Sequence, residues 1–174
     1  MYLRGGDEYA DRELQLLSEL LATIDAKVFE VMTLIGVSVD PESEGLTDRG
    51  EYFIGVGLSA IQQYLTDTLT LTGISKSRAF DIGPRHSDRF TFVAVVNAGA
   101  NWWKHSAEWV GQPAQNRLAL KTQEIVIEVA DTEDYPLSNV LAKLQGTSQI
   151  TLSTLLPNLV LWRSAVDLER QQNA

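Results

Sequence analysis

A chain of 174 residues, 44% hydrophobic and 21% charged, has the length and composition of a single globular domain that spans residues 1–174. Its formal net charge of -9 disfavours contact with RNA or other polyanions, because nucleic-acid-binding proteins usually present a basic face. The absence of cysteine excludes disulfides, thiol catalysis and cysteine-based zinc sites. No leader-like segment and no run of about 18 apolar residues occurs, so we expect a cytoplasmic protein of bacterial type that is not membrane-bound.

The first predicted element is a long helix over about residues 7–35. Asp7, Glu8 and Asp11 lie near its start, where carboxylates suit the positive end of the helix dipole. Gly36 and Pro41 predict its end, and residues 40–50 are expected to form a loop. Its apolar residues recur at spacings of three and four, which places them on one face: Leu17, Leu20, Leu21, Ile24, Val28, Val31 and Ile35.

A second helix is predicted over about residues 51–71, with Thr47 or Asp48 as its cap. Gly55 and Gly57 weaken such a helix by about 1 kcal/mol each relative to alanine, but they allow another helix to approach closely. The polar and basic segment 74–87, which contains Gly83 and Pro84, is expected to be a long irregular connection.

Residues 88–104 have a mixed pattern. Phe90, Phe92, Val93, Val95 and Val96 are typical of a strand. The run nevertheless continues without a turn signal, which makes it too long for a typical strand, and some of its apolar residues also share one helical face. We therefore predict a helix that ends near His105.

Three further helices are predicted in the last third of the chain. Pro113 opens a helix over about residues 113–130, within which Ile125–Val129 could alternatively form a short strand. Ser138 is expected to cap a short helix that ends before Gly146. Ser153 or Thr154 is expected to cap the last helix, with Pro157 in its first turn. The sequence thus predicts an all-α protein, an up-down bundle of about five to six helices.

The strongest functional signal is the segment from Asn101 to Trp109. On a helix, Asn101 and His105 share one face, so an amide and an imidazole stand side by side. Histidine is a common general acid or base, Asn101 could fix its tautomer or bind a substrate oxygen, and Lys104 could stabilise negative charge. The opposing interpretation is structural, because tryptophans at helical spacing, such as Trp102 and Trp103, usually pack in a core.

We expect neither a metal ion nor a cofactor. His105 and Glu108 are three residues apart, but His86 is the only other histidine, so a closed zinc site would need carboxylates from elsewhere. The sequence has no Gly-rich phosphate loop, nucleophile elbow or dinucleotide fingerprint.

The segment Asn101-Trp102-Trp103-Lys104-His105 resembles a motif of HEPN-like proteins, which are helical bundles common in bacterial defence and toxin–antitoxin systems. Many members carry an arginine, often followed by asparagine, then three residues and histidine. In active members the resemblance implies a metal-independent ribonuclease whose paired motifs meet across a dimer. The resemblance implies that the arginine stabilises the negative charge of the phosphorane-like transition state. Here Ala100 stands where the family has this arginine, so the stabilisation would come from Lys104, from Arg89 or from no residue.

Three functions remain open at this stage. The first is a non-catalytic, HEPN-like helical module that forms a homodimer, with a possible protein partner, in a defence, toxin–antitoxin or regulatory complex. The second is a weak metal-independent ribonuclease that uses His105, with Asn101 and Lys104 assisting. The third is a small-molecule pocket between helices. The residues that we expect to contribute to binding are Trp102, Trp103, Glu108, Trp109 and Arg89. Trp162 is expected to line the small-molecule pocket together with the other three tryptophans.

Overall fold

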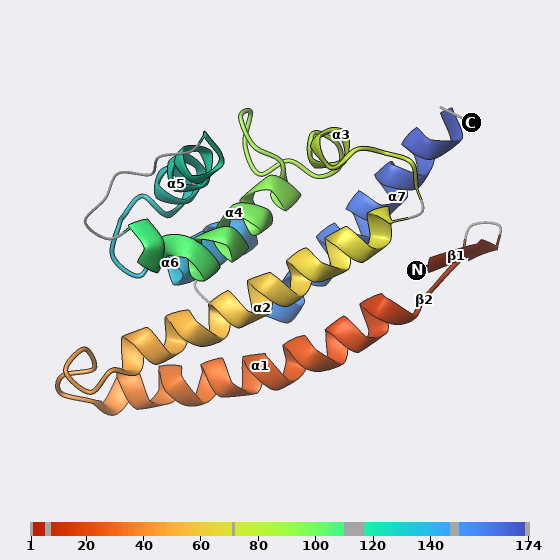
Figure 1. Ribbon diagram of the computed structural model, residues 1–174. Coiled ribbons are helices and arrows are strands. Elements are labelled where there is room, and N and C mark those ends of the chain that lie inside the picture. Colours follow the sequence, from red (N-terminus) through yellow and green to blue (C-terminus); the bar gives the residue numbers. More distant parts are fainter. Residues whose placement is uncertain (1, 6–7, 71, 110–116, 147–149, 173–174) are drawn as a thin grey trace.

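The computed structural model describes residues 2–5, 8–70, 72–109, 117–146 and 150–172, and it is an all-α helical bundle (Figure 1). Two long helices, α1 (Arg12–Val37) and α2 (Leu46–Leu69), form an antiparallel hairpin. α4 (Phe92–His105) packs against α2, α5 (Arg117–Ala130) against α4, and α6 (Pro136–Gln145) against α5. The last helix, α7 (Leu156–Gln172), runs behind the hairpin in Figure 1. The predicted all-α class is confirmed.

None of the described helices is both long and apolar enough to cross a membrane.

The structure contains short elements that the sequence pattern did not predict. β1 (Tyr2–Gly5) pairs antiparallel with β2 (Glu8–Asp11), so the first helix begins at Arg12, and the predicted start near residue 7 was wrong. α3 (Lys76–Phe80) lies in the segment predicted to be irregular, and the Ser75 side chain caps it by accepting a hydrogen bond from Arg78 N. The described part of the chain therefore has seven α-helices rather than five to six.

Other boundaries differ by a few residues. α2 begins at Leu46, inside the predicted loop, and α6 begins at Pro136, so Ser138 lies inside α6 rather than at its cap. The helix prediction for residues 88–104 was correct, because α4 runs from Phe92 to His105. Ile125–Val129 lies within helix α5, and the expected start at Pro113 falls outside the described residues.

Two carboxylates on the hairpin cap elements that come more than 80 residues later in the chain. Asp25 accepts hydrogen bonds from the backbone N–H groups of Leu152 and Ser153, at 2.6 and 3.0 Å, where the 3-10 helix η2 (Leu152–Leu155) leads into α7. Glu51 does the same for Leu137 and Ser138 in the first turn of α6, at 2.9 and 2.7 Å. Free backbone donors at a helix N-terminus need such partners. The cap predicted at Ser153 or Thr154 is therefore supplied by α1 instead.

Glycines let α2 and α4 approach each other closely. A Cβ atom on Gly55 of α2 would lie 2.0 Å from Cδ1 of Trp103, and a Cβ on Gly99 of α4 would lie 2.8 Å from Cδ1 of Leu58. Each helix thus receives a large side chain of the other over a glycine. For Gly55 this contact confirms the predicted close approach of another helix, whereas Gly57 lies against Leu152 of the 3-10 helix η2.

We expect Gly55→Ala to destabilise the protein by about 1–3 kcal/mol, because the added methyl displaces the Trp103 ring from a packed interface. Gly36→Ala is the matched control: its Cβ meets no atom within 4 Å, so the higher helix propensity of alanine should stabilise α1 by up to about 1 kcal/mol. Urea unfolding measures both free energies. Equal effects of the two substitutions would contradict this account of the α2–α4 contact.

A buried ionic junction ties the start of α1 to α2 and α7. Asp11 Oδ1 accepts a hydrogen bond from Leu14 N at 2.9 Å, and its Oδ2 accepts from Tyr64 Oη at 2.8 Å and from Arg163 Nη1 at 2.6 Å. The side chains of Asp11 and Arg163 are each 5% exposed. Burial by itself raises the pKa of Asp11, but the hydrogen bonds and the charge of Arg163 outweigh it, so the pKa lies below its ordinary value.

Asp11→Asn should destabilise the protein by about 3 kcal/mol near pH 7, because it removes one charge of a buried pair. Because the pKa of folded Asp11 is lowered, its contribution is fully present above about pH 4, the ordinary aspartate value, and is lost as pH falls further. Urea unfolding of both proteins at pH 7 and pH 3 measures this: the difference should shrink at pH 3. A difference that grew on acidification would rule out an ionised Asp11.

Candidate functional site

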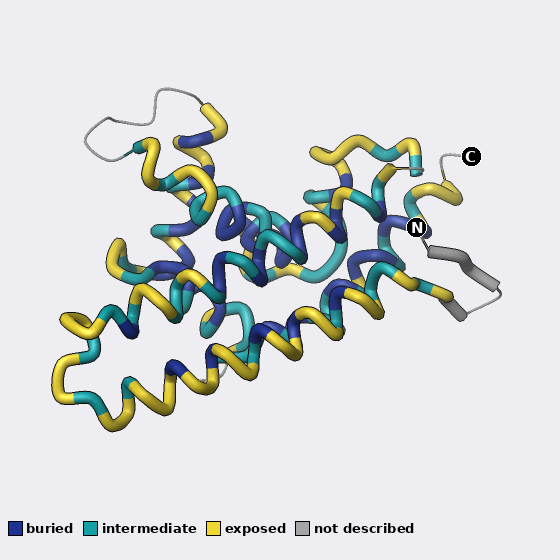
Figure 2. Tube along the Cα trace, turned by 60° about the horizontal axis from the view of Figure 1, so that its bottom comes forward, coloured by how far each residue is buried: buried dark blue, intermediate teal, exposed yellow. Residues whose placement is uncertain are grey.

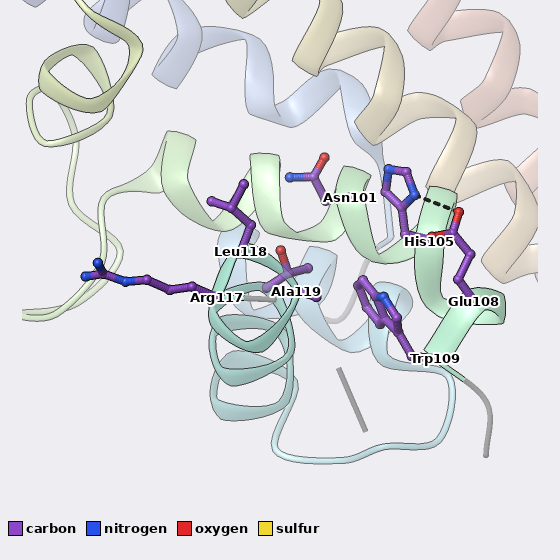
Figure 3. Close-up of a pocket in the computed structure, with 8 residues that line it drawn as sticks. Asn101, His105, Glu108, Trp109, Arg117, Leu118 and Ala119 are labelled. Atoms are coloured by element: carbon purple, nitrogen blue, oxygen red, sulfur yellow. Dashed lines mark hydrogen bonds and ion pairs between the residues drawn. The ribbon is translucent and has the colours of Figure 1, made fainter. Parts of the chain in front are cut away.

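The solvent-facing side of α4 carries a polar stripe. Val96 and Ala100 are fully buried, so α4 presents Asn97, Asn101 and His105, each four residues after the last, away from the core. The two asparagines are half-buried and His105 is exposed. The predicted pairing of Asn101 and His105 on one helical face is confirmed, and Figure 3 shows both side chains rising from the same side of α4.

Gln62 of α2 organises one edge of this stripe. Its amide nitrogen donates to Asn97 Oδ1 at 2.8 Å and to Asn101 Oδ1 at 2.9 Å, and its oxygen accepts from Lys104 Nζ. The oxygen of Asn101 thus already accepts one hydrogen bond, and its NH2 can donate to a ligand. Gln62 was not singled out from the sequence, because only the packing of α2 against α4 brings it to Asn101.

Lys104 thus reaches toward α2 and does not line the groove that contains His105. Partial burial lowers the pKa of Lys104 below the ordinary lysine value, and the charge of Lys76 acts in the same direction. The amine is held by Gln62, 42 residues earlier in the chain, so this structure does not place it beside the imidazole.

His105 pairs with Glu108 of the following 3-10 helix, η1 (Ser106–Trp109). The distance from His105 Nδ1 to Glu108 Oε1 is 3.1 Å, and the two side chains are 47% and 68% exposed. A carboxylate can only accept a hydrogen bond, so Nδ1 carries the hydrogen, and in the neutral imidazole Nε2 keeps a free lone pair. This arrangement gives an oriented and accessible hydrogen-bond acceptor, which is also the arrangement of a general base.

A groove of about 410 Å³ lies between the C-terminal end of α4, η1 and the start of α5 (Figure 3). Asn101 and His105 line it from α4 and Trp109 from η1, and α5 contributes Leu118, which is 79% exposed. Arg117 also lines the groove, but Figure 3 shows its side chain extended away from His105. The α5 residues were not found from the sequence, because the 3.6-residue pattern marks Leu118 as an ordinary apolar helix position.

The tryptophans divide into groove and core residues. Trp109 lines the groove and meets Trp102 edge to face, with ring centroids 5.9 Å apart. Trp102 and Trp103 are half-buried against the hydrophobic core, and Trp103 also contacts Tyr52 edge to face at 5.7 Å. Trp162 is fully buried, and its indole N–H donates to Ala79 O at 2.8 Å. A pocket lined jointly by all four tryptophans is therefore not formed.

Arg89 forms its contacts with α5 and not with His105. Its guanidinium forms ion pairs with Glu124 and Glu128 of α5 and lies 5.0 Å from the ring centroid of Phe90. These contacts anchor the segment before α4 to α5. Arg89 is not among the described residues that line the groove with His105.

Ala100 occupies the position at which the HEPN-like motif, which this segment resembles, has its arginine. It is fully buried in the main core, about 100° around the axis of α4 from Asn101 of the polar stripe. An arginine side chain at this position would have to leave the core to reach His105. Among the described residues, no group of three or more His, Asp or Glu side chains could hold a metal ion.

Comparisons of this chain with protein-family models, with curated proteins and with solved structures find no match.

Proposed function

We propose that this protein is a non-catalytic binding module and that the groove between α4, η1 and α5 binds a small, neutral, planar ligand. The observation that carries the proposal is the pairing, one helical turn apart, of the Asn101 NH2, which has no hydrogen-bond acceptor among the described residues, with the Nε2 acceptor of His105. A donor beside an acceptor complements the C=O and N–H of an amide or lactam. Trp109 and Leu118 offer apolar surfaces for a flat ring.

The charge of the groove supports a neutral ligand. Glu108 is exposed beside His105, and the two cations expected from the sequence are held away from it, Lys104 by Gln62 and Arg89 by glutamates of α5. Arg117 does line the groove, but its side chain extends away from His105 (Figure 3). Phosphate sites rely on cations aimed at the anion. A carboxylate next to the only imidazole of the groove repels phosphate, so a base, nucleoside or amide fits better than a nucleotide.

Uracil is a suitable probe, because its ring presents adjacent C=O and N–H groups. We expect it to shift the NMR signals of the Trp109 indole N–H and the Asn101 side-chain amide, whereas 1,3-dimethyluracil, which lacks N–H, should shift neither. Asn101→Asp retains the oxygen that Gln62 needs but loses the donor, so it should weaken binding by about five- to tenfold. Equal shifts with both compounds, or no shift with either, would reject recognition of the lactam edge.

The biological setting that we propose is that of HEPN-like modules in bacterial defence, toxin–antitoxin or regulatory complexes. The match of Asn101 and His105 to the family motif and the all-α bundle support this assignment. The substitution of the motif arginine by a buried alanine supports a member without catalytic activity.

One observation favours ribonuclease activity as a second candidate: the exposed His105–Glu108 pair has the arrangement of a general base. We expect no RNA cleavage that depends on His105, because among the described residues Arg117 is the cation that lines the groove, and its side chain points away from His105. Incubation of single-stranded RNA with the protein and with His105→Ala, in the presence of EDTA, tests this. Cleavage by the original protein that the variant lacks would establish the ribonuclease and reject the non-catalytic proposal.

A further inference from the structure

The groove between α4, η1 and α5 has a buried floor, and Thr122 is its polar residue. Ala119 and Thr122 are the two buried residues among the described ones that line the groove, at 6% and 7% exposure. Arg117 and Leu118, which precede them on α5, are exposed. Figure 2 shows this change from exposed to buried segments at the start of α5, just after the longest grey stretch. Thr122 is thus more than nine-tenths buried and still borders the groove.

The hydroxyl of Thr122 has no hydrogen-bond acceptor among the described residues. A threonine on a helix often donates to the carbonyl oxygen four residues earlier. Thr23, Thr33 and Thr66 of this chain do so, at 3.1, 2.8 and 3.0 Å. Thr122 makes no such bond to Leu118 O, which lies within the described part of α5. Its hydroxyl hydrogen is therefore available to a molecule in the groove.

This hydroxyl indicates the kind of atom that it would meet. The large majority of buried polar side-chain atoms in proteins have a hydrogen-bond partner, because a buried donor without an acceptor is unfavourable. A hydroxyl can donate and accept, but the hydrogen is the part that needs a partner. The matching ligand atom next to Thr122 is therefore an acceptor, such as a carbonyl oxygen.

Three polar groups then face the groove from two helices. On α4, the Asn101 NH2 is a donor and His105 Nε2 is an acceptor, about 6 Å apart along the helix axis. On α5, Thr122 adds a second donor. A lactam, with one C=O and one N–H, matches two of these groups. A cyclic imide matches all three, because its N–H stands between two C=O groups on one edge of the ring.

We propose that Thr122 is a specificity-determining residue, which donates a hydrogen bond to a second carbonyl of the ligand, and that the ligand belongs to the cyclic imides, including 2,4-dioxopyrimidines. The imide N–H faces His105, and its two carbonyl oxygens face Asn101 and Thr122. This inference rests on the proposed function, since it uses the same groove and the same two contacts on α4. It adds the distinction between an imide and a simple lactam.

NMR titration of the protein with uracil and with 4(3H)-pyrimidinone tests the distinction. Both rings have an N–H next to a C=O, but 4(3H)-pyrimidinone has a hydrogen where uracil has its second carbonyl. The indole N–H of Trp109, which lines the groove, reports the binding of either compound. We expect uracil to bind about five- to tenfold more tightly, which is the effect of one additional hydrogen bond to a buried group.

Substitutions at Thr122 separate its hydroxyl from its packing. Thr122→Val replaces the hydroxyl with a methyl group of similar size, so it should abolish the preference for uracil and leave the affinity for 4(3H)-pyrimidinone unchanged. Thr122→Ser keeps the hydroxyl and should keep the preference. Thr23→Val is the matched control, because it removes an exposed helical hydroxyl from α1. Urea unfolding checks that each variant folds, and the midpoint of Thr122→Val should not fall, since the hydroxyl has no partner to lose.

The outcomes distinguish this inference from the proposed function. Equal affinity of the original protein for the two compounds, or a preference for uracil that Thr122→Val retains, would overturn the role of Thr122 and leave recognition of the lactam edge intact. Binding of neither compound to the original protein would reject the proposed function, and this inference with it.

Discussion

The close packing of α2 against α4 is the constraint on which the rest of the structure depends. Gly55 receives Trp103, and Gly99 receives Leu58, so each helix accepts a bulky side chain of the other where it has none of its own. This reciprocal contact fixes both the separation of the helices and the rotation of α4 about its axis. Once the Trp103 side of α4 faces α2, Ala100 is directed into the core, and Asn101 and His105 are directed to the surface.

The rotation of α4 also determines the chemistry of the groove. Gln62 lies close enough to hold the Asn101 oxygen and the Lys104 amine, which separates Lys104 from the imidazole that follows it in sequence. Glu108 sets the tautomer of His105, and α5 covers the other side of the groove with Leu118. Among the described residues, Arg117 also lines this surface of donors, acceptors and apolar groups, but its side chain extends away from His105. This arrangement supports our proposal of a binding site rather than a site of phosphodiester cleavage.

The α1–α2 hairpin supports the bundle through polar contacts as well as apolar ones. Asp25 and Glu51 supply the N-terminal hydrogen-bond partners for η2 and for α6, and Asp11 joins the start of α1 to Tyr64 and Arg163. Leu16 and Leu20 of the same hairpin remain partly exposed to water.

The sequence by itself determined the helical class, the long helices and the placement of Asn101 and His105 on one face, because these features follow from a 3.6-residue repeat. The pattern also predicted that the glycines of α2 admit another helix. It missed α3 and the start of α1 at Arg12, since both depend on local capping by Ser75 and Asp11. Only the tertiary structure decided what surrounds His105. The partners of Asn101, Lys104 and Arg89 are between 35 and 42 residues away in the chain, and no local periodicity encodes contacts at that separation.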